Sequence, residues 1–168
     1  MLREISAGGV VVRPTGHGWD VAVIEPQRKP ANKPSDKKRH KEVLALPKGL
    51  VDSGEKPEHT AIREVHEETG VTATIVTKLT DIKYVYVRSW SDKQRVFKIV
   101  SFYLLRHESG EIGDISEEMK IEVRRAMWIP LGRALRELSY GGERDAVKLA
   151  QRYLEVQAKE RPDGKNRS

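Results

Sequence analysis

The sequence predicts a single α/β domain in which a mixed β-sheet is flanked by helices. Three observations support this fold class. The 168 residues suit one core of ordinary domain size. Several segments alternate apolar and polar side chains as strands do, and three others carry apolar residues at helical spacing. No internal repeat breaks this pattern, so we expect one domain over residues 1–159.

The first expected element is a β-hairpin. Residues 5–13 and 19–25 alternate apolar and polar side chains, and Pro14, Gly16 and Gly18 mark a turn between them. These two strands should therefore pair with each other.

A short strand is expected next, at residues 43–46, followed by a glycine-containing loop at 47–56. A helix should begin at Pro57, because proline suits the first helical position. Glu58 favours the positive end of the helix dipole, and Gly70 is placed to end the helix.

The remaining expected elements are strands at 72–88 and 95–107, an acidic loop at 108–122, a strand at 123–129, and helices at 131–138 and 143–158. The two long strands are rich in β-branched and aromatic residues, so we expect them at the centre of the sheet, joined by a polar turn at 91–94. In the last helix, Val147, Leu149, Ala150 and Leu154 should face the core. Residues 160–168 are expected to form a disordered polar tail.

The positive charge is concentrated in one segment. The chain has 31 Lys and Arg against 25 Asp and Glu, a formal net charge of +6. Residues 28–41 hold seven of these cations, Arg28 among them, and one acid, Asp36, so this segment alone carries +6. We interpret 26–41 as an inserted basic loop. It is either a cationic flap for a highly phosphorylated substrate or a solvated insertion without a catalytic role.

Composition excludes several classes of protein. With no cysteine, disulfide frameworks, thiolate zinc sites and cysteine nucleophiles are excluded, which leaves carboxylates and histidines as metal ligands. The longest apolar stretch near the start, residues 7–12, is far too short for a bilayer, and no export signal is visible. The expectation is a cytoplasmic protein with no membrane span, and no obligate protein partner is inferred.

The most informative stretch is 49–71, where a glycine loop leads into a helix crowded with carboxylates. Glu64, Glu67 and Glu68 stand at i, i+3 and i+4, so they project from one face and repel by roughly 0.2–0.5 kcal/mol per pair. Arg63 could pair with Glu67, but a divalent cation would neutralise more of the cluster. Oxygen ligands favour Mg²⁺, with Mn²⁺ as an alternative. Taken alone, the cluster also fits an ordinary solvated helix face.

The spacing of this stretch resembles the signature box of the Nudix hydrolases. Gly49 is followed after five residues by Glu55 and after seven more by Arg63-Glu64, and then by Val65, Glu67-Glu68, Gly70 and Val71. The resemblance implies an α/β/α sandwich with a loop-helix-loop box. It also implies Mg²⁺-dependent hydrolysis of nucleoside diphosphates linked to another moiety.

Carried over position by position, this resemblance implies roles for individual residues. Glu64, Glu67 and Glu68 fall on metal-binding positions, Arg63 on the arginine that orients them, and Glu55 on the structural partner of that arginine. These five residues are the expected centre of the site.

Other candidates lie outside the helix. The backbone carbonyl of Lys48 is a further metal ligand in similar proteins, and Glu122 is the best candidate for an extra catalytic or metal-binding glutamate. Glu117 and Glu118 are rivals of Glu122, and all three also fit a surface role. His66 is expected to be a surface residue.

Outside the box, the chain from 46 to 154 resembles the bacterial diadenosine tetraphosphate hydrolases. The supporting segments are LPKG at 46–49, YVY at 84–86, RVFK at 95–98, WIPL at 128–131 and LSY at 138–140. Lys48, Lys98 and Arg28 are candidate phosphate contacts, and Tyr86, with Tyr84, is a candidate to stack on a nucleobase. Each also fits an ordinary surface or packing role.

The leading interpretation is a Mg²⁺-dependent hydrolase of nucleoside polyphosphates, such as diadenosine tetraphosphate. An RNA 5′ end is also a possible substrate of such a hydrolase. The first alternative is a clean-up pyrophosphatase for oxidised nucleoside triphosphates. The second alternative is a non-catalytic module that binds a nucleotide or RNA. The intact box argues against that module, because binding alone does not require Arg63 with all three glutamates.

Overall fold

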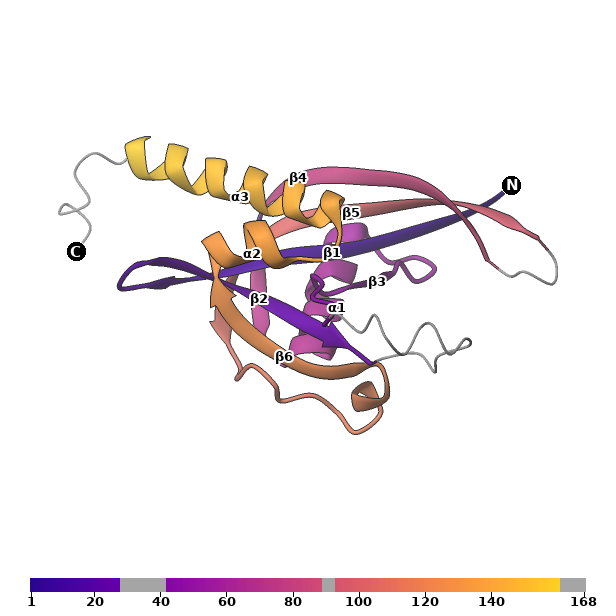
Figure 1. Ribbon diagram of the computed structural model, residues 1–168, viewed down its shortest axis with the longest axis horizontal. Helices are drawn as coiled ribbons and strands as arrows, with labels where there is room; N and C mark the ends of the chain where they lie inside the picture. The colour runs from indigo at the N-terminus through magenta and orange to yellow at the C-terminus, as the bar shows by residue number, and fades with distance from the viewer. Residues whose placement is uncertain (28–41, 89–92, 161–168) are drawn as a thin grey trace.

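The computed structural model describes residues 1–27, 42–88 and 93–160 (Figure 1). Its elements are β1 (Leu2–Thr15), β2 (Gly18–Pro26), β3 (Lys48–Leu50), α1 (Pro57–Thr69), β4 (Thr72–Val87), β5 (Arg95–Ser109), the 3₁₀ turn η2 (Met119–Ile121), β6 (Val123–Pro130), α2 (Leu131–Glu137) and α3 (Gly141–Glu160). Among these residues, no helix has the length and apolar character needed to cross a membrane.

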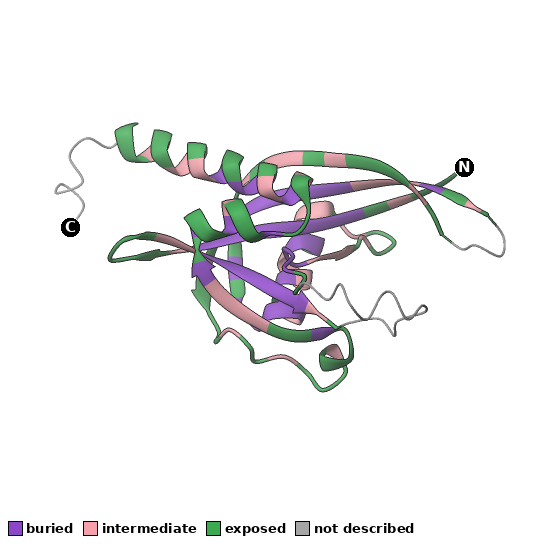
Figure 2. Ribbon diagram, viewed as in Figure 1, coloured by how far each residue is buried: buried purple, intermediate pink, exposed green. Residues whose placement is uncertain are grey.

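One mixed sheet joins the strands in the order β4-β5-β1-β2-β6, and β3 pairs with β1. β1 runs parallel to β5, and the other pairs are antiparallel. Helix α1 packs on one face through Ala61 and Val65, while α2 and α3 pack on the other through residues such as Ala134 and Val147. Burial is greatest in the sheet between these layers (Figure 2). The predicted α/β/α sandwich is confirmed.

Helix α1 has the predicted boundaries. Lys56 precedes it with an extended backbone, Pro57 occupies its first turn, and Glu58 adds a negative charge at the positive end of the dipole. Gly70 ends the helix with φ 84°, a left-handed conformation that glycine adopts without strain, and its N–H donates to the carbonyl of His66. Local sequence therefore sets both ends of this helix.

The predicted hairpin of β1 and β2 is confirmed, but the position predicted for both long strands is wrong in part. β5 lies inside the sheet, whereas β4 is an edge strand. Three register shifts interrupt the pairing of β4 with β5, and such bulges are common at sheet edges. Many side chains of β4 are exposed despite its β-branched and aromatic composition.

The strand predicted at 43–46 is also wrong. Only Ala45 forms a bridge, to Ile24, and the neighbouring strand, β3, lies inside the segment predicted as a loop. The N–H groups of Leu44 and Leu46 bind side chains instead, the Ser139 hydroxyl at 3.0 Å and the carboxylate of Glu143 at 2.7 Å. The side chains of Leu44 and Leu46 are buried as in a strand, but their N–H groups donate to side chains rather than to a neighbouring strand.

Two predictions near the C-terminus need correction. Leu149 is exposed, and Ala146 takes its expected place in the core next to Val147 and Ala150. Glu160 belongs to α3 rather than to a tail. The basic segment at 28–41, the first half of the turn predicted at 91–94 and the rest of the tail lie outside the described residues.

Candidate functional site

Lys48 and Glu68 connect β3 to the acidic helix. Glu68 is 8% exposed, and its carboxylate accepts the backbone N–H of Lys48 at 2.9 Å. Gly49 allows a second carboxylate to approach β3, because a Cβ at this position would overlap the carboxyl group of Glu64. The glycine loop and the helix thus pack closely enough to place both glutamates against the strand.

Arg63 organises the acidic residues of the box. Its Nε and Nη2 bind both carboxylate oxygens of Glu55 at 2.8 and 2.9 Å, and its Nη1 binds Glu64 at 2.9 Å and Glu67 at 3.2 Å. Asp52 adds a longer ion pair at 3.4 Å. Hydrogen bonds from Arg63 lower the pKa of Glu55 to about 2. The expected pairing of Arg63 with Glu55 and Glu67 is present.

Burial and repulsion oppose ionisation of the other carboxylates. Burial raises the pKa of Glu64, and repulsion by Glu67 adds to the effect. Burial also raises the pKa of Glu68 to about 8, against the hydrogen bond from Lys48, while Glu64 and Glu122 raise it further. In the absence of a cation, this cluster is therefore electrostatically unfavourable when fully charged.

Glu122 interacts electrostatically with two glutamates of the box. Glu122 is exposed, follows η2, and raises the pKa of both Glu64 and Glu68. Its rival Glu117 instead pairs with Lys120 at 2.8 Å. Its electrostatic effect on Glu64 and Glu68 favours Glu122 over Glu117 as the loop acid of the site.

The residues present fit a hard divalent cation. Four carboxylates, those of Glu64, Glu67, Glu68 and Glu122, offer oxygen ligands and repel one another in a partly buried setting. In the described residues, no three acidic or histidine side chains converge on one point, because Glu64 is turned to Arg63 and Glu68 to β3. Binding would require these carboxylates to turn toward one another.

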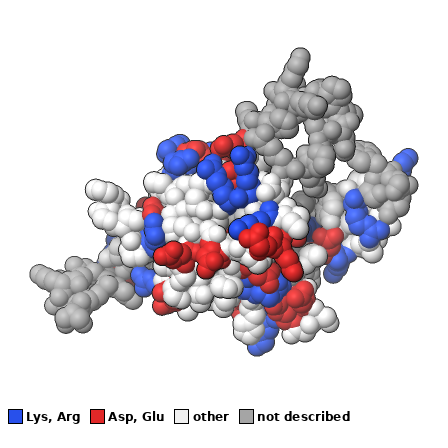
Figure 3. Space-filling view, turned by 90° about the horizontal axis from the view of Figure 1, so that it is seen from below, with Lys and Arg blue, Asp and Glu red and all other residues white. Residues whose placement is uncertain are grey.

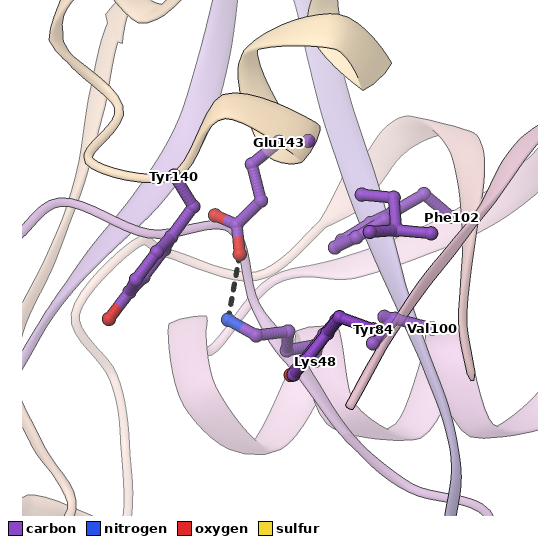
Figure 4. A pocket seen from close by; sticks show the side chains of 8 residues that line it. Lys48, Tyr84, Val100, Phe102, Tyr140 and Glu143 are labelled. Atoms are coloured by element: carbon purple, nitrogen blue, oxygen red, sulfur yellow. Dashed lines mark ion pairs between the residues drawn. The ribbon is translucent and has the colours of Figure 1, made fainter. Parts of the chain in front are cut away.

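A pocket lies on the opposite face of the sheet (Figure 4). It has a volume of about 380 Å³ and opens between β4, β5, Lys48 and the start of α3. Tyr84 and Phe102 line it from the strands, and Tyr140 lies across from them. Aromatic side chains around such a cavity suit a flat organic group.

An ion pair forms the polar end of this pocket. The Lys48 Nζ lies 2.9 Å from Glu143 Oε2 and 5.6 Å from the centre of the Tyr140 ring. Burial lowers the pKa of Lys48, but the attraction and hydrogen bond of Glu143, together with the charge of Glu68, outweigh it, so the pKa is raised. Lys48 therefore contacts both sites, the box through its N–H and the pocket through its ammonium group.

The other predicted substrate contacts lie elsewhere. Tyr86 packs 6.2 Å from Tyr84, but its hydroxyl donates to Glu4. Lys98 pairs with Glu4 at 3.7 Å. His66 is exposed, as predicted. Arg28 lies outside the described residues.

Sequence reasoning missed Glu143. This residue is 4% exposed and stands in the first turn of α3, where an acid is common on dipole grounds alone. Nothing in the sequence points to its pairing with Lys48, 95 positions earlier. In the sequence, Tyr140 stands out only as part of the LSY segment at 138–140, which resembles diadenosine tetraphosphate hydrolases.

The comparisons with known proteins support this fold. Residues 2–151 match the NUDIX domain family, and the chain belongs to that family. The predicted family is thus confirmed.

Individual relatives extend the comparison. The chain is 33% identical over 154 residues, 92% of its length, to a Mycobacterium tuberculosis (strain CDC 1551 / Oshkosh) protein named as mutator protein MutT4. It is 33% identical over 104 residues, 62% of its length, to an 8-oxo-(d)GTP phosphatase of Mycolicibacterium smegmatis (strain ATCC 700084 / mc(2)155). It spans 57% and 29% of these relatives' lengths.

A solved structure supports the fold. The binary complex of a C. elegans Ap4A hydrolase gives a TM-score of 0.65 at 21% identity, covering 91% of this chain and 98% of that chain. The names of these relatives agree with the predicted enzyme class, a Nudix hydrolase acting on nucleotide anhydrides.

Proposed function

We propose that this protein hydrolyses a pyrophosphate linkage in nucleoside polyphosphates, with Mg²⁺ held by Glu64, Glu67, Glu68 and Glu122. The carboxylate cluster carries this proposal, because burial and repulsion make it unfavourable without a cation. When bound, a divalent ion shields phosphoryl oxygens and lowers the pKa of an attacking water. Mn²⁺ offers the same chemistry, and the carbonyl of Lys48 is a further candidate ligand.

The protein's own residues prepare this site. Arg63 holds Glu64 and Glu67 on one side of α1, and Glu55 fixes the guanidinium group in turn. The N–H of Lys48 orients Glu68. Either a box glutamate or Glu122 serves as the general base in this proposal.

The pocket on the α3 face is the proposed site for a nucleobase. Tyr84, Phe102 and Tyr140 offer aromatic surface, and base stacking on such surfaces contributes about 1–3 kcal/mol per base. Lys48 lies between this pocket and Glu68, so a phosphate chain that starts at the pocket would pass its ammonium group.

Dinucleoside polyphosphates such as diadenosine tetraphosphate are the proposed substrates within this class. The charge of +6 in 28–41 supports a highly charged substrate. Gln27, which directly precedes this segment, donates its N–H to the carbonyl of Glu122 at 2.9 Å. The residue before the basic segment therefore lies beside a proposed metal ligand, which also supports a highly charged substrate. An RNA 5′ end carries similar chemistry, and a phosphate contact by Arg28 remains a prediction.

Nucleoside triphosphates, including oxidised ones, are the second candidate. The names of two sequence relatives, a mutator protein and an 8-oxo-(d)GTP phosphatase, support this class. The cytoplasmic location expected from the sequence also remains a prediction.

A substrate panel tests the proposal. Diadenosine tetraphosphate, nucleoside triphosphates, 8-oxo-dGTP, ADP-ribose and 5′-triphosphorylated RNA would be incubated with the protein, and the products resolved by chromatography. We expect cleavage of the tetraphosphate to require Mg²⁺ or Mn²⁺ and to stop in excess chelator. Undiminished turnover in chelator would refute the metal mechanism, and faster cleavage of triphosphates would favour the second candidate.

A further inference from the structure

The far ends of three strands form an arm that extends past the helices (Figure 1). The arm consists of residues 2–5 of β1, 83–87 of β4 and 95–99 of β5. Strand pairing determines which residues are neighbours across the arm. For example, Phe97 of β5 lies between Arg3 of β1 and Val85 of β4. The arm is thus a three-stranded platform beyond the covered part of the sheet.

One side of the arm continues the face on which α1 packs. Ala7 contributes to the cluster under α1, and Arg3 and Ile5 precede it at intervals of two residues, which places them on the same face. We call this side the arm face; its members are Arg3, Ile5, Lys83, Val85, Val87, Arg95, Phe97 and Ile99.

The arm face combines exposed apolar side chains with cations. Ile5, Val85 and Val87 are between 43% and 49% exposed, and Phe97 and Ile99 are partly exposed. The face also holds three cations and no acid. A patch of this kind on a soluble protein indicates a binding surface.

The charges on the two sides of the arm differ. On the opposite side, Glu4 accepts a hydrogen bond from Tyr86 and pairs with Lys98 at 3.7 Å. On the arm face, no ion pair within 4 Å joins Arg3, Lys83 or Arg95 to the residues that the structure describes. The nearest acid on this side of β4 is Asp81, which pairs with Lys78 at 3.0 Å and also attracts Lys83. Figure 3 shows Lys and Arg at the right-hand end of this view and also in its middle, where they lie beside the Asp and Glu.

We propose that the arm face binds single-stranded nucleic acid. A nucleic acid strand supplies phosphates for Arg3, Lys83 and Arg95, and bases that pack on Phe97 and the aliphatic side chains around it. A second copy of this chain fits poorly, because a two-fold interface would bring like cations together. An acidic protein segment would match the charge but would leave the aromatic surface of Phe97 without a stacking partner.

Fluorescence anisotropy tests this proposal independently of hydrolysis. The probe is a labelled oligouridylate of about a dozen nucleotides, in excess chelator, at low and at physiological salt. The test variant is Arg3→Gln/Lys83→Gln/Arg95→Gln. The matched control, Lys148→Gln/Arg152→Gln/Lys159→Gln, removes the same charge from exposed positions of α3.

We expect the arm variant to bind at least about tenfold more weakly. The slope of log affinity against log salt should fall by about 2, since each phosphate contact to a single strand contributes about 0.7. The control should stay within about threefold of the unmodified protein. Phe97→Leu should also weaken RNA binding roughly fivefold or more, because it removes stacking but keeps apolar volume.

Three results would overturn the proposal. They are undetectable RNA binding, equal losses in the arm and control variants, or polyglutamate of matched charge binding as tightly as RNA. The second result would assign binding to net charge or to another segment, and the third to an acidic protein partner. Circular dichroism melting establishes that each variant is folded, and single Arg3→Gln and Arg95→Gln replacements substitute for the triple variant if it is unstable.

Discussion

The two faces of the sheet hold different parts of the proposed site, assembled in different ways. On the α1 face, the charged groups from Glu55 to Glu68 come from one continuous stretch. On the α3 face, the pocket takes residues from β3, β4, β5 and α3, and one of its hydrogen bonds joins positions 97 apart in sequence, Leu46 and Glu143. A local motif therefore supplies most of the acidic site, to which folding adds Glu122 and the backbone of Lys48, whereas folding alone builds the pocket.

Lys48 connects the two faces. Its N–H donates to Glu68, and its ammonium group pairs with Glu143. If this connection has a function, changes on one face should affect the other.

Glu68→Gln should have the largest effect. The substitution preserves shape and the acceptor for Lys48 but removes a charged oxygen, so kcat should fall roughly 100-fold or more. Folding should survive, because a buried carboxylate with a raised pKa tolerates a neutral replacement. Steady-state kinetics with thermal melting would measure both, with Glu117→Gln as a matched control. A near-normal kcat in a folded Glu68→Gln protein would contradict the ligand assignment.

Glu143→Gln should break the connection between the faces. It leaves the ammonium group of Lys48 without its partner, and breaking such a buried pair should lower the free energy of unfolding by about 2 kcal/mol. The double variant Glu143→Gln/Lys48→Met should recover part of the loss, because it removes the unpaired charge. Chemical denaturation measures these values. If the double variant were less stable than the single one, the pair would not be the cause.

Tyr84→Ala should raise KM by roughly tenfold with little change in kcat, since stacking on a base is lost. Tyr86→Ala is the matched control on the same strand. Because Tyr86 does not line the pocket, its effect on KM should be smaller. A larger effect of Tyr86→Ala on KM would support the sequence-based prediction that Tyr86 stacks on the nucleobase. It would also argue against the pocket as the site of the base.

Glu55→Gln should have the smallest effect, seen in acid. The folded-state pKa of Glu55 is about 2, below its ordinary value of 4.5, so its ionised form stabilises the protein above about pH 4.5. This contribution is lost as the pH falls toward 2. The stability difference between the unmodified protein and Glu55→Gln should therefore shrink across that interval. Denaturation at several pH values measures it, with Glu118→Gln as control; a constant difference would argue against the Arg63 pairing.

Much of the acidic face was predictable, because helix geometry is local. The spacing of Glu64, Glu67 and Glu68 places them on one side of α1, and Pro57 and Gly70 mark its ends. Strand propensity in β4, by contrast, did not reveal an edge position. Propensity describes how a residue fits a sheet, and strand order depends on partners elsewhere in the chain.

The family, the acidic helix and the β1–β2 hairpin follow from the amino-acid sequence, since each depends on residues that are close along the chain. The parallel pairing of β1 with β5, the pairing of Lys48 with Glu143 and the gathering of cations on the arm face follow from tertiary packing alone. These features join residues that lie far apart along the chain. Periodicity fixes which side a residue faces within its own element, but burial and charge pairing depend on the elements that pack against it.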